Sequence, residues 1–175
     1  MISKLFVIEW VGPFSEIEEL KKWEKDNNIM RNYYFYIISG KPPNMRNYRS
    51  YCGITQNKDG YVYKRYQWDS NHKIHTMRDK EIWIGRFSDN SVHSRSDIEL
   101  CETMIVSYWQ PELNNKKKST YPSSNIVLIN RWFKTDLTPR QNNIYIAQRM
   151  SDLIILDDSG IWGTEKVRKL VDFDL

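Results

Sequence analysis

Residues 33–55, YYFYIISGKPPNMRNYRSYCGIT, hold the strongest fold signal in the chain. Residues 33–38 are rich in aromatic and β-branched side chains, which is typical of a strand. The run SGKPP over residues 39–43 ends this strand, because glycine and proline favour turns. A polar loop then leads to a short strand over residues 50–55. The sequence therefore predicts two strands joined by a loop.

The segments on both sides alternate between strand and helix patterns. The expected elements are a strand over residues 3–11 closed by a turn at Gly12-Pro13, a helix ending near Asp26, a helix beginning near Val62, a strand over residues 82–87, and a helix from a Ser96–Glu99 capping box to Trp109. Beyond residue 115, periodicity does not decide between strands and helices. We therefore expect a compact α/β or α+β domain with terminal extensions.

Length and composition exclude several classes of protein. The chain has 175 residues, of which 40% are hydrophobic and 14% aromatic, too many for a disordered chain. No apolar run approaches the roughly 18 residues of a membrane span, so we expect no membrane association. Cys52 and Cys101 are too few for a disulfide scaffold or a zinc finger, and we expect a reduced, cytoplasmic setting.

Basic residues gather in the middle of the chain. The net charge is +4, but residues 1–30 carry −2 and residues 150–175 carry −3, which leaves +9 for the middle. A basic centre with interleaved aromatic residues suits a polyanion such as nucleic acid. The alternative is the solvated surface of a lysine-rich protein, and charge alone does not decide between the two.

Five polar residues follow one another in a distinctive order of elements. They are Tyr36 in the first strand of the 33–55 stretch, Tyr51 in the second, Arg65 early in the next helix, Glu102 in the capped helix, and Asn114 in a closing Pro-Glu-Leu-Asn. In this order of features the chain resembles the GIY-YIG endonuclease family.

This resemblance implies a fold and a division of the chain. It covers about residues 33–115 and implies an α/β (α+β) core with a small three-stranded sheet flanked by helices, as in GIY-YIG nucleases. Residues 1–32 would form an N-terminal strand–helix extension, and residues 116–175 a C-terminal extension packed on the core. Inserted loops at residues 41–50 and 116–125 would read DNA sequence or form a dimer contact.

The resemblance also implies the chemistry of a metal-dependent endonuclease that hydrolyses DNA phosphodiester bonds. One Mg²⁺ or Mn²⁺ ion would be held by Glu102, whose hard oxygen ligands suit these ions. Arg65 would contact the scissile phosphate with its planar fork of donors. Tyr36 and Tyr51 would position or activate the attacking water, and Asn114 would orient a neighbouring group by hydrogen bonds.

The sequence departs from the family pattern at several positions. Tyr34-Phe35 stands where the family has Gly-Ile, and Cys52 stands where it has Ile. The family often carries a His or Tyr on the helix shortly after the arginine, but the fourth residue after it here is Asp69. His72, seven residues after the arginine and thus on the same helical face, is our candidate for assisting proton transfer, and His75 is the next.

Each candidate also has an ordinary structural role. Glu102 lies on an otherwise apolar helix face, where a carboxylate needs a partner, and pairing with Arg65 or Arg86 would satisfy it equally well. Glu99 is the rival acid, but its place in the capping box already explains it. Tyrosines are common strand formers, and single arginines, histidines and asparagines are common at surfaces and in turns.

Within the family, a short chain with modest extensions is similar to restriction-type or mobile-element nucleases. The leading hypothesis is therefore sequence-specific cleavage of double-stranded DNA, with a homodimer if the target is palindromic. Two alternatives stay open: a nucleic-acid-binding module that keeps the scaffold without cleavage, and a nuclease that cuts RNA. The nuclease hypothesis expects Tyr36, Tyr51, Arg65 and Glu102 to converge on one concave surface.

Overall fold

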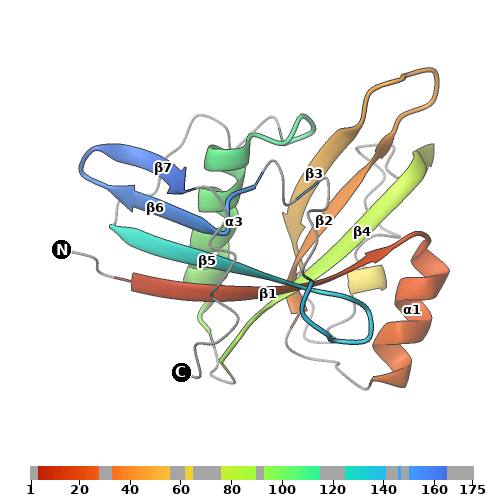
Figure 1. The fold of residues 1–175 in the computed structure, drawn as a ribbon, viewed down its shortest axis with the longest axis horizontal. Coiled ribbons are helices and arrows are strands. Elements are labelled where there is room, and N and C mark those ends of the chain that lie inside the picture. The colour runs from red at the N-terminus through yellow and green to blue at the C-terminus, as the bar shows by residue number, and fades with distance from the viewer. Residues whose placement is uncertain are drawn as a thin grey trace.

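The described residues form one curled, mixed sheet of seven strands (Figure 1). The computed structural model describes residues 4–27, 33–55, 62–64, 76–89, 93–114, 125–140, 146 and 150–164. The strands are β1 (Lys4–Phe14), β2 (Tyr33–Lys41), β3 (Arg49–Ile54), β4 (Arg78–Phe87), β5 (Ile126–Phe133), β6 (Leu153–Asp157) and β7 (Gly160–Thr164). Their order in the sheet is β3-β2-β4-β1-β5-β6-β7.

The expected small three-stranded sheet flanked by helices is wrong. The strands β3, β2 and β4 are adjacent and antiparallel, as a three-stranded core requires, but the sheet does not end there. The strand β1 pairs antiparallel with β4 on one side and parallel with β5 on the other. The N-terminal strand therefore joins the two halves of one larger sheet, and β6 and β7 extend it beyond β5.

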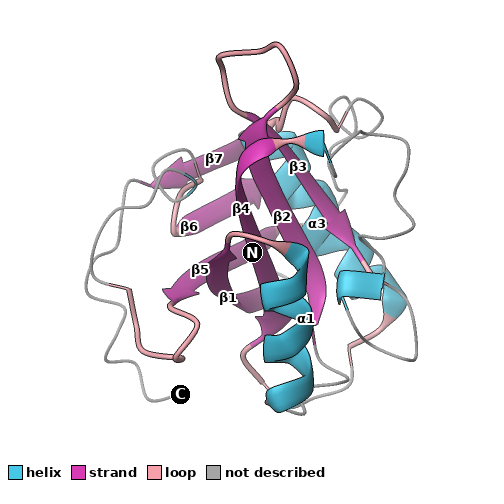
Figure 2. Ribbon diagram, turned by 90° about the vertical axis from the view of Figure 1, so that its right-hand side faces the viewer, coloured by secondary structure: helices cyan, strands magenta, loops and turns pink. Residues whose placement is uncertain are grey.

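The N-terminal strand also runs further than its sequence predicts. Gly12-Pro13 was expected to close the strand with a turn, but β1 continues to Phe14. The pairing with β4 shifts register between Val11 and Phe14, so the extra residues form an irregularity within the strand. Such bulges bend a strand and increase its twist, in keeping with the curl of the sheet (Figure 2).

Two helices cover opposite faces of the sheet: α1 (Ile17–Asp26) and α3 (Arg95–Trp109). Successive residues of a strand point to opposite faces, and the apolar clusters follow this alternation. The α3-side cluster includes Phe35 and Ile37 of β2 with the buried apolar residues of α3. The α1-side cluster comprises Val11, Phe14, Leu20, Tyr36, Ile38, Val62, Tyr63, Met77, Ile82 and Ile84. Within the described ranges, no helix is both long and apolar enough to cross a membrane.

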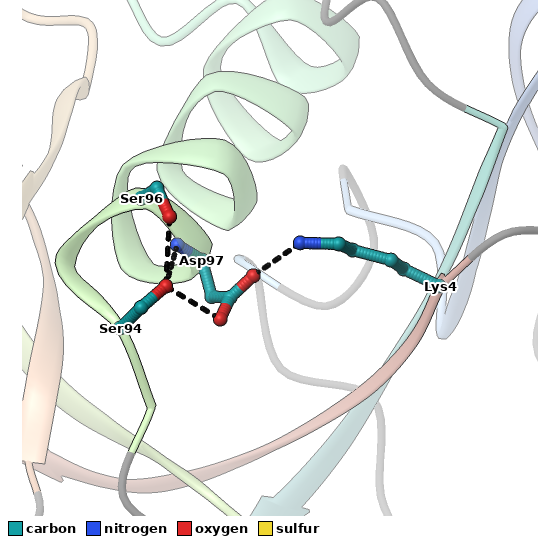
Figure 3. A network of polar contacts seen from close by, with 4 residues as sticks. All are labelled: Lys4, Ser94, Ser96 and Asp97. Carbon is teal, nitrogen blue, oxygen red and sulfur yellow. Dashed lines mark hydrogen bonds and ion pairs between the residues drawn. The ribbon is translucent and has the colours of Figure 1, made fainter.

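The start of α3 is fixed to β1 by a polar network (Figure 3). The N-cap is Ser94, two residues earlier than the expected Ser96, and its Oγ accepts a hydrogen bond from the backbone N–H of Asp97 at 3.2 Å. The Nζ of Lys4 pairs with Asp97 Oδ1 at 2.6 Å. This ion pair and the cap together lower the pKa of Asp97, first through the Lys4 hydrogen bond. The helix that carries Glu102 is thus anchored at its first turn.

Candidate functional site

The side chains of Tyr36 and Tyr51 lie together on the α1 side of the sheet. Their ring centroids are 5.9 Å apart, and Tyr36 pairs in register with Gly53. A Cβ added to Gly53 would lie 2.6 Å from Cζ of Tyr36 and 2.7 Å from Cε1 of Tyr51. Only glycine therefore lets the two rings pack over β3. Tyr36 is buried at 1% exposure, whereas Tyr51 keeps part of its surface exposed.

The segment that follows α3 covers the outer edge of β3. Asn114 is buried, and its Oδ1 accepts from the Cys52 N–H at 2.8 Å while its Nδ2 donates to the Cys52 carbonyl at 2.6 Å. The carboxylate of Glu112 accepts from the Ser50 N–H, and the Leu113 N–H donates to the Ser50 carbonyl. The segment thus satisfies the outward backbone groups of β3 and fixes the strand that carries Tyr51.

Glu102 lies in α3, and only 5% of its surface is exposed. The helix packs against β3, but its apolar side chains belong to the α3-side cluster, on the face opposite Tyr36 and Tyr51. The structure therefore places the helix that carries Glu102 and the tyrosine pair on opposite faces, and the expected convergence of Glu102, Tyr36 and Tyr51 on one surface is not seen among the described residues. No group of three or more His, Cys, Asp or Glu side chains in the described part of the chain forms a metal cluster.

The remaining predicted residues, Arg65 and His72, lie outside the described residues, as do the alternatives Asp69 and His75. The described residues nearest to Arg65 in sequence form a helical turn at 62–64. Val62 and Tyr63 belong to the α1-side cluster together with Tyr36, and Tyr51 packs against that cluster. The segment that leads into Arg65 therefore packs on the same face as the tyrosine pair.

A buried acid that the sequence analysis missed holds this turn. Glu24 of α1 is 1% exposed, and its Oε1 accepts from the Val62 N–H at 2.8 Å while its Oε2 accepts from the Tyr63 N–H at 3.1 Å. The spacing in the sequence could have predicted its burial, because Glu24 follows Leu20 by four residues and Ile17 by seven and so lies on the apolar face of the helix.

Burial raises the pKa of Glu24 to about 7, although the two backbone hydrogen bonds oppose the shift. Lys21, whose ammonium lies 5.7 Å from the centre of the Tyr63 ring, is one turn away on the same helix. Because the folded pKa lies above the ordinary value of 4.5, the folded state retains a proton between pH 4.5 and 7 that the unfolded chain has lost. The stability from this group is complete below pH 4.5 and lost as the pH rises through 7.

Glu24→Gln is therefore expected to alter the pH dependence of stability. From pH 5 to pH 8.5, the free energy of unfolding should fall by about 2–3 kcal/mol more in the wild type than in the variant, because the neutral amide does not ionise. Urea unfolding at both pH values measures this difference. Glu18→Gln, an exposed acid of the same helix, is the control and should shift by less than about 0.5 kcal/mol. Parallel profiles for the wild type and Glu24→Gln would contradict the assigned pKa.

The loop between β2 and β3 carries basic and aromatic side chains. Residues 41–49 contain three basic residues and no acid, and the loop projects beyond the sheet (Figures 1 and 2). The ammonium of Lys41 pairs with Asp79 at 2.7 Å and lies 5.0 Å from the centre of the Tyr48 ring. Arg46 is exposed and Arg49 is partly exposed, so both can contact a ligand at this surface.

Comparison of the chain with protein-family models, with curated proteins and with solved structures finds no match. The case for a function therefore comes from the site itself: the tyrosine pair over Gly53, the Asn114 contacts to β3, the buried Glu102 and the basic loop.

Proposed function

We propose that the protein is a metal-dependent endonuclease that hydrolyses phosphodiester bonds of double-stranded DNA. The observation that carries the proposal is the packing of Tyr36 and Tyr51 over Gly53, because this pairing across two strands is the geometry that the resemblance to GIY-YIG nucleases requires. The Asn114 contacts to Cys52 support it, since they fix the strand that bears Tyr51.

Each side chain has a role in this proposal. Glu102 would hold one Mg²⁺ or Mn²⁺ ion, and a single carboxylate fits an ion that keeps most of its water ligands. When bound, the metal would stabilise negative charge on the phosphate. The partly exposed Tyr51 would orient the attacking water, with the buried Tyr36 holding its ring in place. Arg65 would contact the phosphate, and His72 would assist proton transfer.

Double-stranded DNA is the proposed partner, and the basic loop between β2 and β3 is the proposed contact surface. Arg46 in this loop and Arg49 at the start of β3 can attract phosphate, and neutralised phosphates release their counterions. Restriction-type cleavage of a palindromic site would require a homodimer, because each strand then needs its own active site.

Arg46→Ala and Arg49→Ala are each expected to weaken DNA binding uniformly across sequences. Loss of one phosphate contact should make the slope of log K against log salt shallower by about 0.9. Fluorescence anisotropy with a labelled duplex at several salt concentrations measures both effects. Arg95→Ala, which removes an exposed arginine at the start of α3, is the matched control. Slopes equal to that of the wild type in both loop variants would remove this surface from the proposal.

A second candidate function is nucleic-acid binding without cleavage. It is favoured by one observation: α3, which carries Glu102, packs on the sheet face opposite the tyrosine pair. A scaffold that keeps the tyrosines and the basic loop but separates them from the acid would bind without cutting. A nuclease that uses the same site to cut RNA in place of DNA is a further form of the first proposal.

The first test is incubation of supercoiled plasmid and phage DNA with the purified protein, in Mg²⁺, in Mn²⁺ and in EDTA. Discrete fragments that need the metal are the expected result and would support a site-specific nuclease. Metal-dependent nicking or smearing would support a nuclease without sequence specificity. An intact gel shift with no cleavage in either metal would contradict the nuclease and support the binding module, and parallel reactions with RNA identify the polymer.

A further inference from the structure

The carboxylate of Glu24 connects two parts of the chain that are far apart in sequence. Glu24 lies in α1, within the N-terminal 32 residues, and its two oxygens accept the backbone N–H groups of Val62 and Tyr63. Nothing else in the described part of the chain bonds to this carboxylate, which is almost wholly buried. A buried acid needs hydrogen-bond partners, and among the described residues one helical turn supplies them.

The turn at residues 62–64 packs beside the proposed site. Val62 and Tyr63 belong to the α1-side cluster with Tyr36, and Tyr51 packs against this cluster. Displacement of the turn would therefore disturb the packing around the two tyrosines.

We propose that Glu24 is a positioning residue, which holds the 62–64 turn against the sheet face that carries Tyr36 and Tyr51 and thereby fixes the tyrosine pair in place. This inference rests on the nuclease function proposed above. It assigns to the N-terminal helix a role in the chemistry of Tyr36 and Tyr51, which the resemblance to GIY-YIG nucleases does not assign to it.

The need for an acid at this position follows from the two hydrogen bonds. An ionised carboxylate offers two acceptor oxygens, one for each N–H group. The amide of glutamine offers one oxygen and one NH₂ group, so a Glu24→Gln variant keeps the size of the side chain but loses one of the two hydrogen bonds to the turn. Glu24→Ala removes both acceptors. The two variants therefore form a graded series.

Steady-state cleavage of supercoiled plasmid by the full chain at pH 8.5 tests the inference. We expect kcat to fall about tenfold in Glu24→Gln and about a hundredfold in Glu24→Ala, with KM within about twofold, because misplacement near the chemistry lowers rate more than binding. Amide hydrogen exchange of residues 62–64 should be faster in both variants, while the rest of the protein exchanges as in the wild type. Glu18→Gln should match the wild type in every measurement.

The outcomes separate this inference from the proposed function. A kcat equal to the wild-type value in both Glu24 variants would overturn the positioning role and leave the nuclease in place. Unchanged exchange of residues 62–64 would overturn it too, even if kcat fell. If the wild type does not cleave, the nuclease function fails and the positioning role fails with it. A loss of kcat in Glu24→Gln without a loss of stability at pH 8.5 would support the role, because a purely structural residue would lower both together.

Discussion

Glu102→Gln is expected to lower the rate of DNA cleavage about a thousandfold. In the proposed site this carboxylate holds the metal, and loss of the metal's charge stabilisation in the transition state costs about 4 kcal/mol, which corresponds to that factor. Glutamine keeps the volume of the buried side chain, so the fold should persist and DNA affinity should stay within about twofold. Single-turnover cleavage and gel-shift titration measure the two quantities separately.

The control for this experiment is Glu99→Gln. Glu99 lies one turn earlier in α3 and pairs with Arg95 at the surface, so its loss removes a charge from the same helix without touching the proposed metal ligand. Cleavage by this variant should stay near the wild-type rate, because exposed pairs contribute little. Wild-type cleavage by folded Glu102→Gln protein would contradict the metal role, and the nuclease would then need another acid.

Asn114→Ala is expected to lower the free energy of unfolding by about 3–4 kcal/mol. The variant removes two buried hydrogen bonds, one to the N–H and one to the carbonyl of Cys52, and the loss of each costs about 1–3 kcal/mol. Urea unfolding measures the change. The control is Asn47→Ala, an exposed asparagine in the loop between β2 and β3, which should change stability by less than about 0.5 kcal/mol.

The size of the Asn114 effect also tests how the edge of β3 is covered. Cleavage should fall with stability, because Tyr51 lies on the strand that the amide fixes. A loss below about 1 kcal/mol would show that water replaces the amide at Cys52, and that the 112–114 segment does not depend on this contact.

Local sequence patterns predicted those strands and helices whose conformation depends on residues close by in the chain. The aromatic run at residues 33–38 correctly predicted β2, although the strand continues past the expected SGKPP break to Lys41, and the strand expected over 50–55 is confirmed as β3 (Arg49–Ile54). Membership of the sheet was not predictable in this way. The parallel pairing of β1 with β5 joins Lys4 to Ile126, and no local period encodes a contact between residues so distant.

Individual residues of the site show the same limit. Glu24 lies on an apolar helix face, but its role depends on two backbone N–H groups that tertiary packing brings to it. Asn114 is indistinguishable in sequence from an ordinary turn asparagine, yet its amide bonds to Cys52, 62 residues earlier. The two tyrosines differ, because the resemblance placed Tyr36 and Tyr51 in the two signature strands and the structure has their rings 5.9 Å apart on one face of that strand pair.

The central place of β1 has a consequence for the order of events during synthesis. During synthesis β1 is made before both of its neighbours, β4 and β5, and β5 begins only at residue 126. Until β5 has been made, that side of β1 lacks its native partner and is open to strands of other nascent chains. Closing the seam between β1 and β5 is a long-range, entropically costly step, and such steps slow folding. Once made, β5 therefore covers this edge of β1 and prevents it from pairing with other chains.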